Sequence, residues 1–490
     1  MRMLYLDVDT LRADHLGCYG YPRDTSPNID RLAEEGVRFE NCYASDAPCL
    51  PSRSALFSGR FGVHTGVVNH GGKNADPRLE EGKREFQSLY SRNSWVSLMA
   101  RKGFHTVTVS PFAERHSAWW FYAGFKEIYN PGICGMERAD EVFPFAEKWL
   151  KENAKKPDWF LHVNFWDPHT PYRTPLEFGN PFKDSPLEGW LTEDILKKHK
   201  KSFGPHSASE PHGFGYETWW REYPRVPERI ETIKDYKRWI DGYDTGISYT
   251  DAFIGKIVEI LKKEGVWKDT IVILSSDHGE NQGELNVYGD HQTADYITSR
   301  VPLIIRWPGL GSGVVDRCLH YQTDMAATVL DLLGIEIPEC WDGESFAASL
   351  RGEKEVSRDF LVVSQCAWSC QRGVIFDDFI LIRTYHTGLK NFPEYMLFNL
   401  REDPHEVNNL AENRPELVKK GIFLLEKWLT YQMETSENKT DPLWEVIEEG
   451  GPFHTRDKEE EMYYRRLKET GREKFLELLK VSRGKPISKF

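Results

Sequence analysis

The sequence has no closely paired cysteines. Its eight cysteines are scattered over 490 residues, and none forms a Cys-x-x-Cys pair. We therefore expect neither a disulfide framework nor a structural zinc site, and interpret most of these side chains as small buried hydrophobic groups. Cys49 stands apart because it directly precedes a Pro-Ser-Arg turn in the stretch APCLPSR. Its thiol could be an ordinary buried group, a redox centre or a nucleophile.

Positive charge and long apolar runs are also scarce. The formal net charge is −13, which argues against nucleic acid or an anionic membrane as a partner, because both attract basic patches. No uninterrupted apolar run approaches the roughly 18 residues of a membrane-spanning helix. The apolar run that begins at residue 3 is only a few residues long and has no signal-peptide cleavage site after it. We therefore expect a cytoplasmic protein.

Strand and helix patterns alternate through most of the chain. Short β-rich segments occur at MLYLDV, GFHTVTVS, DWFLHVNF, TIVILSS and RVPLIIRWPG. Apolar residues at helical spacing predict a helix that begins near Ile247 and ends at Gly265. This alternation predicts an α/β sheet with helices on both faces.

The pattern changes after about residue 345, which predicts a boundary there. We expect a large α/β domain over residues 1–345 and a smaller antiparallel sheet with a packing helix over residues 346–435. Residues 436–490 are strongly charged and largely helical in pattern, and we interpret them as an extension that packs on the surface.

Acidic residues follow two of the predicted strands. Asp7 and Asp9 end the first strand, and Asp277 and His278 follow TIVILSS, so they can converge at one edge of the sheet. Carboxylate oxygens favour a hard cation, and we expect Ca²⁺, with Mg²⁺ as the alternative. Asp7 and Asp9 point to the same side, but Asp7 lies deeper and could instead bind a basic neighbour. Thr10 could add a hydroxyl or carbonyl oxygen.

The stretch around Cys49 predicts the start of a helix. Pro51 suits a first turn, and the helix can continue to Gly59. Free N–H groups and the helix dipole at that end favour a thiolate or an alkoxide at Cys49. Arg53 lies one turn further on, where it can pair with this group or with an anionic substrate.

These motifs together resemble the sulfatase family. CLPSR followed by SALFSGR resembles the sulfatase signature. The segments DTLRADHLGCYGYPRDTSPNIDRLAEEGVRFENCYA, NFWDPHTPY, ILSSDHGE, RVPLIIRWPG and LFNLREDPHEVNNLA are similar to the family in the same order, over roughly residues 3–410. The resemblance implies a formylglycine-dependent type I sulfatase with an alkaline phosphatase-like α/β fold, built on a large mixed, mostly parallel sheet.

The resemblance implies that Cys49 is oxidised to formylglycine by a separate maturation enzyme. The aldehyde hydrate carries two hydroxyls on one carbon. One hydroxyl attacks sulfur and expels the alcohol. The second hydroxyl then loses its proton, which releases sulfate and regenerates the aldehyde. Asp9, Asp277 and His278 match the family's metal ligands, with converted Cys49 completing the shell. Thr10 stands where the family has a second carboxylate, so Thr10 or Asp7 would have to compensate.

The resemblance also assigns roles around the sulfate. Arg53 matches the arginine that orients formylglycine, and His169 matches the histidine that contacts sulfate or protonates the leaving oxygen. Arg115 and His116 stand nearest to the family's Lys-x-His motif, and His116 could be the base for sulfate release. His291 takes the place of a lysine, where it could act as a general acid.

Three functions remain open from the sequence. The first is a sulfatase acting on an organic sulfate monoester, most readily a small sulfated mono- or oligosaccharide such as a glycosaminoglycan fragment. The second is a phosphomonoester, phosphodiester or phosphonate-ester hydrolase of the same superfamily, with Asp290 and His291 helping to hold a second metal and Thr10 as nucleophile. The intact CLPSR motif argues against it. The third is a binding protein with a degenerate site.

Tryptophans in presumed loops offer faces for sugar stacking, although packing explains them equally well. They are Trp119, Trp120, Trp166, Trp219 and Trp220. The oligomeric state is left undetermined by the sequence.

Overall fold

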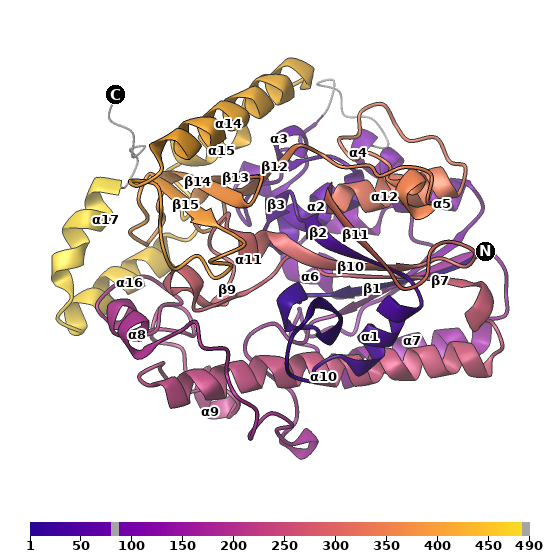
Figure 1. The fold of residues 1–490 in the computed structure, drawn as a ribbon, viewed down its shortest axis with the longest axis horizontal. Helices are drawn as coiled ribbons and strands as arrows, with labels where there is room; N and C mark the ends of the chain where they lie inside the picture. The colour runs from indigo at the N-terminus through magenta and orange to yellow at the C-terminus, as the bar shows by residue number, and fades with distance from the viewer. Residues whose placement is uncertain (80–87, 483–490) are drawn as a thin grey trace.

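Two main β-sheets organise the chain (Figure 1). The computed structural model describes residues 1–79 and 88–482. The larger sheet has eight strands in the order β11-β2-β10-β7-β1-β6-β4-β5. Their bounds are Arg2–Val8 (β1), Val37–Tyr43 (β2), His105–Val109 (β4), Glu127–Tyr129 (β5), Trp159–Phe165 (β6), Thr270–Ser275 (β7), Arg300–Arg306 (β10) and Val314–Tyr321 (β11). Within this sheet β10 alone runs antiparallel to its neighbours, so the predicted mixed, mostly parallel sheet is confirmed.

Strand β1 lies inside the larger sheet because its sequence is nearly continuously apolar, as burial on both faces requires. It pairs in parallel with β6 and β7, which places Asp7 beside Asn164 and Ser275. The carboxyl ends of the three strands therefore meet at one edge, where Asp9 follows β1 and Asp277 follows β7.

Helices cover both faces of the larger sheet, as the alternating pattern predicted. One face carries α1 (Pro27–Glu34), α7 (Ala139–Asn153) and α10 (Ile233–Lys263). The other carries α2 (Cys49–Ser58), α5 (Trp95–Arg101) and α12 (Gln322–Leu332). Leu4 and Leu6 of β1 point to the α10 side, whereas Met3 and Tyr5 point to the α2 side. By the same alternation Asp7 faces α2, which begins at Cys49.

Helix α10 is longer than the sequence predicts. The predicted helix from Ile247 to Gly265 corresponds to its second half, and the structure extends it back to Ile233. Gly242 and Gly246 lie in the added part. A β-carbon on Gly246 would stand 2.9 Å from the ring of Pro168, so this glycine lets the helix pack directly on the loop that carries His169.

The smaller sheet has five strands in the order β15-β14-β13-β12-β3. Their bounds are Asp46–Ala47 (β3), Phe360–Gln365 (β12), Cys370–Phe376 (β13), Phe379–His386 (β14) and Tyr395–Asn399 (β15). The last four are antiparallel and pack against α14 (Pro415–Thr435), which confirms the predicted small antiparallel sheet with a helix. Strand β3 pairs in parallel with β12 and ends two residues before Cys49. The domain boundary near residue 345 stays a prediction. Strand β3 comes before this boundary in the chain but pairs with β12, which comes after it.

The C-terminal extension is helical and partly buried. Its helices are α15 (Pro442–Glu448), α16 (Asp457–Glu469) and α17 (Leu476–Ser482). Leu443 and Val446 of α15 join a buried cluster with Cys366 and Cys370, and Tyr463 of α16 is fully buried. We expected the extension to pack on the surface of the protein (yellow in Figure 1). The structure shows in addition that it contributes apolar side chains to small buried clusters.

Shorter elements complete the described part of the chain. They are α3 (Gly62–Thr65), α4 (Leu89–Asn93), α6 (Phe112–His116), α8 (Glu193–Lys200), α9 (Trp219–Glu222), α11 (Tyr296–Ser299), α13 (Ala347–Leu350), β8 (Asn281–Gln282) and β9 (Tyr288–Asp290). Across residues 1–79 and 88–482, none of the helices combines the length and the apolar character needed to cross a bilayer.

Candidate active site

Four buried side chains meet at the carboxyl edge of the larger sheet. Asp9 follows β1, Asp277 and His278 follow β7, and Cys49 begins α2. One ligand atom from each lies within 4.8 Å of the others. The structure thus brings together the four residues that the sequence analysis named as metal ligands.

Arg53 links the carboxylates of this cluster. Its Nη1 donates to Asp9 at 2.9 Å and to Asp277 at 2.5 Å, while Nε and Nη2 donate to the two oxygens of Asp7 at 2.9 and 3.2 Å. All four side chains are essentially without solvent exposure. Three carboxylates that share one guanidinium leave two negative charges uncompensated. One divalent cation would neutralise them.

Asp7 is the deepest of the three carboxylates. Both of its oxygens accept hydrogen bonds from Arg53, and His162 lies 3.3 Å from one of them. Burial acts to raise the pKa of Asp7, but the charge of Arg53 and the hydrogen bond from His162 outweigh it, so the pKa lies below its ordinary value. This geometry favours the second of the two roles considered for Asp7, a carboxylate bound to a basic neighbour.

Asp9 and Thr10 offer the open oxygens. In the described part of the chain, neither Asp9 Oδ1 nor Thr10 Oγ1 has a hydrogen-bond partner, although both are buried. Thr10 has φ of 57°, a conformation that costs a β-branched residue about 1–3 kcal/mol and that tends to occur at functional sites. Tyr243 holds it there by donating to its carbonyl at 2.7 Å. Two unpaired hard oxygens beside excess negative charge fit a divalent cation.

The thiol of Cys49 is not a thiolate in this setting. Burial raises its pKa well above the usual range, and the carboxylates of Asp9 and Asp277 raise it further. Our interpretation that the helix N-terminus stabilises a thiolate was wrong, because partial charges at the start of α2 do not offset burial beside two carboxylates. A redox or thiolate role for Cys49 is correspondingly disfavoured.

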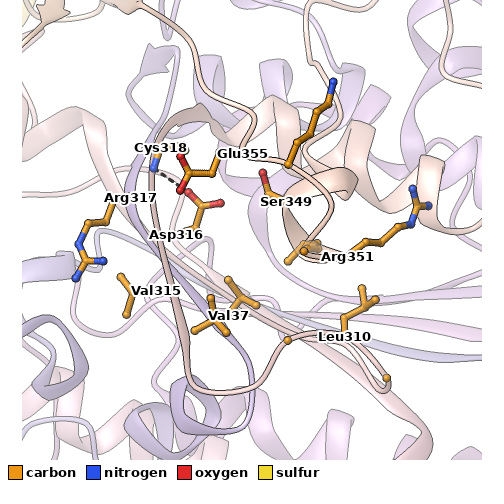
Figure 2. A pocket seen from close by; sticks show the side chains of 15 residues that line it. Val37, Leu310, Val315, Asp316, Arg317, Cys318, Ser349, Arg351 and Glu355 are labelled. Carbon is orange, nitrogen blue, oxygen red and sulfur yellow. Dashed lines mark hydrogen bonds between the residues drawn. The ribbon is translucent and has the colours of Figure 1, made fainter.

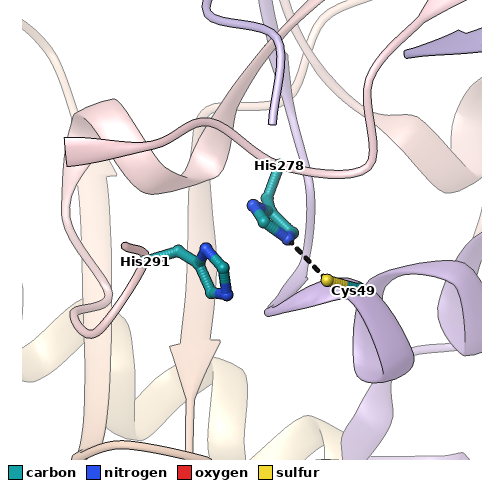
Figure 3. Close-up of side chains that lie close together, drawn as sticks. All are labelled: Cys49, His278 and His291. Atoms are coloured by element: carbon teal, nitrogen blue, oxygen red, sulfur yellow. Dashed lines mark hydrogen bonds between the residues drawn. The ribbon is translucent and has the colours of Figure 1, made fainter. Parts of the chain in front are cut away.

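Two histidines lie beside Cys49, and a third lies next to one of them. His278 Nδ1 lies 2.8 Å from the carbonyl of Gly279 and so carries the proton, which leaves Nε2 free to face Cys49 Sγ at 3.2 Å (Figure 3). The ring of His291 lies 4.2 Å from that of His278, and the ring of His169 lies 6.0 Å from that of His291. The histidines therefore line one side of the position that the nucleophile would occupy.

His169 and His291 are neutral at rest. Burial lowers the pKa of both rings well below the usual range, and the charge of Arg115 adds to this at His169. A low pKa reduces the fraction of imidazolium that a general acid would need. A bound sulfate acts in the opposite direction, because a nearby negative charge favours the protonated ring.

His116 and Arg115, at the end of α6, take different positions. The His116 side chain is partly exposed and its ring lies 5.0 Å from that of His70; its Nε2 is buried and, in residues 1–79 and 88–482, has no hydrogen-bond partner. Burial lowers its pKa well below the usual range. Arg115 lies over the ring of Trp166 at 4.9 Å and donates to the carbonyl of Cys134 at 3.1 Å. His116 therefore retains a free nitrogen, whereas Arg115 is held by neighbouring groups.

Sequence reasoning missed two histidines near this cluster. His70 packs on His116, and His206 pairs with Asp290 at 2.7 Å. The carboxylate of Asp290 also accepts from the backbone N–H of His291 at 2.7 Å, so it is already engaged, which weakens the alternative of a second metal held by Asp290 and His291. Neither histidine belongs to a motif, and a loop histidine without a partner in the sequence carries no signal of its position.

The tryptophans considered for sugar stacking are dispersed. Trp166 is fully buried, with its ring 5.9 Å from that of His169. Trp119 and Trp219 are exposed, and Trp219 begins α9. Trp120 and Trp220 are partly buried against the two large cores. Among the described residues, Trp166 is therefore the only one of these five tryptophans whose ring contacts a predicted site residue.

Family comparisons give this geometry a context. A model of the sulfatase family matches residues 2–335. The chain belongs to the sulfatase family. A second model, of the C-terminal region of N-sulphoglucosamine sulphohydrolase, matches residues 284–429. This sulfatase is therefore a sulfate-ester hydrolase by class, and its helices α15, α16 and α17 lie beyond both matched regions.

Individual relatives are distant but align over most of their length. The N-acetylglucosamine-6-O-sulfatase of Bacteroides thetaiotaomicron is 23% identical over 508 residues, covering 91% of this sulfatase and 89% of that protein. The structure of a phosphonate monoester hydrolase from Silicibacter pomeroyi matches with a TM-score of 0.68 at 20% identity, covering 89% and 96% of the two chains. A structure in complex with its substrate D-glucosamine-2-N,6-O-disulfate matches with a TM-score of 0.68 at 19% identity, covering 89% and 98%. These structures show a shared fold.

Proposed function

We propose that this sulfatase removes sulfate from a small sulfated saccharide, with formylglycine made from Cys49 and one divalent cation, Ca²⁺ in the first instance. The observation that carries the proposal is the buried group of Asp9, Cys49, Asp277 and His278, whose ligand atoms lie within 4.8 Å of one another. The names of relatives support a saccharide substrate, since one is an N-acetylglucosamine-6-O-sulfatase and another structure holds a glucosamine disulfate.

The residues of the cluster fit these two groups. Asp9, Asp277 and His278 would hold the cation, with Thr10 as a further oxygen donor. A cation there would polarise the sulfate oxygens, and the formylglycine hydrate would supply the attacking hydroxyl. Arg53 holds one oxygen each of Asp9 and Asp277, which leaves Asp9 Oδ1 without a hydrogen-bond partner among the described residues.

The surrounding histidines would move protons. His278 Nε2, unprotonated, faces the nucleophile position and so would serve as a ligand and not as an acid. His291 Nδ1 and His116 Nε2 lack hydrogen-bond partners within the described residues and are the nitrogens available to substrate. We assign proton donation to the leaving oxygen to His169 or His291, and proton removal during sulfate release to His116.

A matched pair of assays tests the proposal. The protein, produced together with a maturation enzyme, is assayed on an aryl sulfate and on an aryl phosphonate monoester, beside Cys49→Ala and the control Cys340→Ala. We expect sulfate hydrolysis that is abolished by Cys49→Ala and unchanged by Cys340→Ala. Equal activity in Cys49→Ala would refute the nucleophile, and preferential phosphonate hydrolysis would move the assignment to the alternative hydrolase class.

A further inference from the structure

A second group of metal-ligand side chains lies on the edge strand β11. Asp316, Cys318 and His320 each offer one ligand atom within 4.8 Å of the others. Strand β11 is the outermost strand of the larger sheet and lies next to β2. In the sequence this group has no paired cysteines and no metal-binding motif, because its three ligands are of three different residue types.

The backbone of β11 is shaped so that these three side chains meet. Residues two apart on a strand share a face. Between Asp316 and Leu319 the strand advances three residues while β2 advances two, from Phe39 to Asn41, which is the signature of a β-bulge. Asp316 accepts from the N–H of Cys318 at 2.8 Å and lies 3.2 Å from His320 Nε2. Such bulges commonly re-aim side chains at functional positions.

The ring of His320 is held in place. It is only 2% exposed, and it lies 4.6 Å from the ring of Phe346 and 5.5 Å from that of Phe39. A fixed imidazole whose Nε2 points at a carboxylate and a thiol is preorganised to bind an ion placed between them.

A pocket of about 540 Å³ opens beside the group. Asp316 and Cys318 line it together with Ser349 and Glu355, and Figure 2 shows the carboxylate of Glu355 close to both. Burial and the charges of Asp316 and Glu355 raise the pKa of the Cys318 thiol, which places Glu355 within electrostatic reach of the sulfur. The pocket thus gives an ion an entry path. It also offers a fourth ligand, a carboxylate oxygen of Glu355.

We propose that Asp316, Cys318 and His320 bind a zinc ion, with Glu355 or a water as the fourth ligand. A thiolate, an imidazole and a carboxylate form a set that suits Zn²⁺, whereas Ca²⁺ takes oxygen ligands alone. Binding displaces the proton of the Cys318 thiol to solvent and uses a lone pair on His320 Nε2. This site is separate from the sulfatase reaction and does not depend on it.

Zinc at this position would fasten two parts of the chain. The segment after α13 runs along β11, where Ser357 accepts from the N–H of Leu319 at 3.1 Å and Arg358 N–H donates to the Leu319 carbonyl at 3.3 Å. That segment leads into β12 of the smaller sheet. An ion bound by both β11 and Glu355 would add metal–ligand bonds to the hydrogen bonds that hold this segment on the edge strand.

Cobalt substitution tests the site. The full chain in a Cys49→Ser background, which removes the thiol of the other cluster, is stripped with a chelator and titrated with Co²⁺. We expect one equivalent of Co²⁺ to give a thiolate-to-cobalt absorption band in the near ultraviolet, and Zn²⁺ to displace it. The band should persist in Cys340→Ser and disappear in Cys318→Ser, with circular dichroism confirming that each variant is folded.

A second variant separates binding from folding. Glu355→Gln keeps the size of the side chain and should weaken Co²⁺ binding by roughly 10- to 100-fold if Glu355 ligates or orients the ion. The shape of the thiolate-to-cobalt absorption band should not change in Glu355→Gln, because Cys318 still supplies the thiolate. A Co²⁺ band that survives Cys318→Ser, or its absence from the Cys49→Ser protein at millimolar Co²⁺, would overturn the proposal.

Discussion

At the scale of single residues, the site depends on how one arginine is shared among three carboxylates. Arg53 occupies both oxygens of Asp7 but only one oxygen each of Asp9 and Asp277. Asp7 is thus fully engaged by Arg53, whereas the second oxygen of Asp277 accepts from the N–H groups of Thr10 and His278, and the second oxygen of Asp9 has no hydrogen-bond partner among the described residues. The sequence placed all of them at one sheet edge, but it could not make this distinction because Arg53 lies 46, 44 and 224 residues from Asp7, Asp9 and Asp277 along the chain.

The pair Asp7→Asn and Asp9→Asn tests that distinction. We expect Asp9→Asn to abolish Ca²⁺ binding and activity, because it removes the open oxygen. Asp7→Asn should cost roughly 10- to 100-fold in metal affinity, since it acts through Arg53. Isothermal titration with Ca²⁺ and kcat on an aryl sulfate measure both effects. An Asp7→Asn protein as deficient in Ca²⁺ binding as Asp9→Asn would show that Asp7 is itself a ligand.

Arg53 has a structural role as well as a catalytic one. Replacing it with Ala removes the one guanidinium that three buried carboxylates share, which we expect to cost about 3–5 kcal/mol of unfolding free energy. Arg53→Lys keeps the charge but cannot form the fork to Asp7, so it should retain more stability than activity. Urea unfolding and kcat check this. Full activity in Arg53→Lys would contradict the role assigned to the fork.

At the scale of elements, loop contacts join the two sheets. His405, after β15, lies 2.9 Å from Glu284 and 3.4 Å from Glu188, and Glu284 also pairs with Arg12 at 3.0 Å. Burial opposes the protonated ring, but the two glutamates outweigh it and raise the pKa of His405 to about 9. The imidazolium therefore stabilises the packing of the smaller sheet on the loops of the larger one.

This pairing predicts a pH dependence of stability. Because the folded-state pKa of His405 lies above its unfolded value of about 6.5, its contribution is complete below that pH and is lost as the pH rises through about 9. We expect the unfolding free energy to fall by up to about 3 kcal/mol over this window. Urea unfolding at both ends measures the loss, and His405→Gln should flatten it. An equal slope in both proteins would exclude His405 as the cause.

The elements also show what sequence patterns can and cannot reveal. Strands β1 and β7 and the start of α2 follow from apolar runs, strand-end aspartates and a proline in the first turn, all of which are local. The first half of α10 was missed because Gly242 and Gly246 lower helix propensity, and their value lies in a close approach to Tyr172 and Pro168. Strand β3 has two residues and exists because β12, over 300 residues away, pairs with it.

At the scale of the whole molecule, the C-terminal extension supports the site from outside the matched family regions. Asp441, at the start of α15, forms a two-bond ion pair with buried Arg372 of β13 at 2.6 and 2.8 Å. The segment before α16 packs on the loop that carries His70, where a β-carbon on Gly71 would stand 2.1 Å from Thr455 Oγ1. The extension thus reaches both the smaller sheet and the surroundings of His116.

Breaking this ion pair should loosen the extension. Asp441→Asn leaves the charge of Arg372 buried without a partner, which we expect to cost about 3–5 kcal/mol of unfolding free energy. Thermal unfolding measures the loss, and Asp457→Asn, on an exposed position of α16, is the matched control. Asp441→Asn should keep its kcat well below its melting temperature. A melting temperature equal to that of the control would show that the pair does not anchor the extension.

The central claim is that Cys49, converted to formylglycine, is the nucleophile of this sulfatase. The most direct test is to vary the maturation enzyme during production and measure, in the same samples, kcat on an aryl sulfate and the mass of the peptide that contains Cys49. Conversion lowers that mass by about 18 Da, because an aldehyde replaces the thiol. We predict that kcat rises in proportion to the converted fraction and extrapolates to zero for unconverted protein. Activity that is independent of the converted fraction would contradict the account.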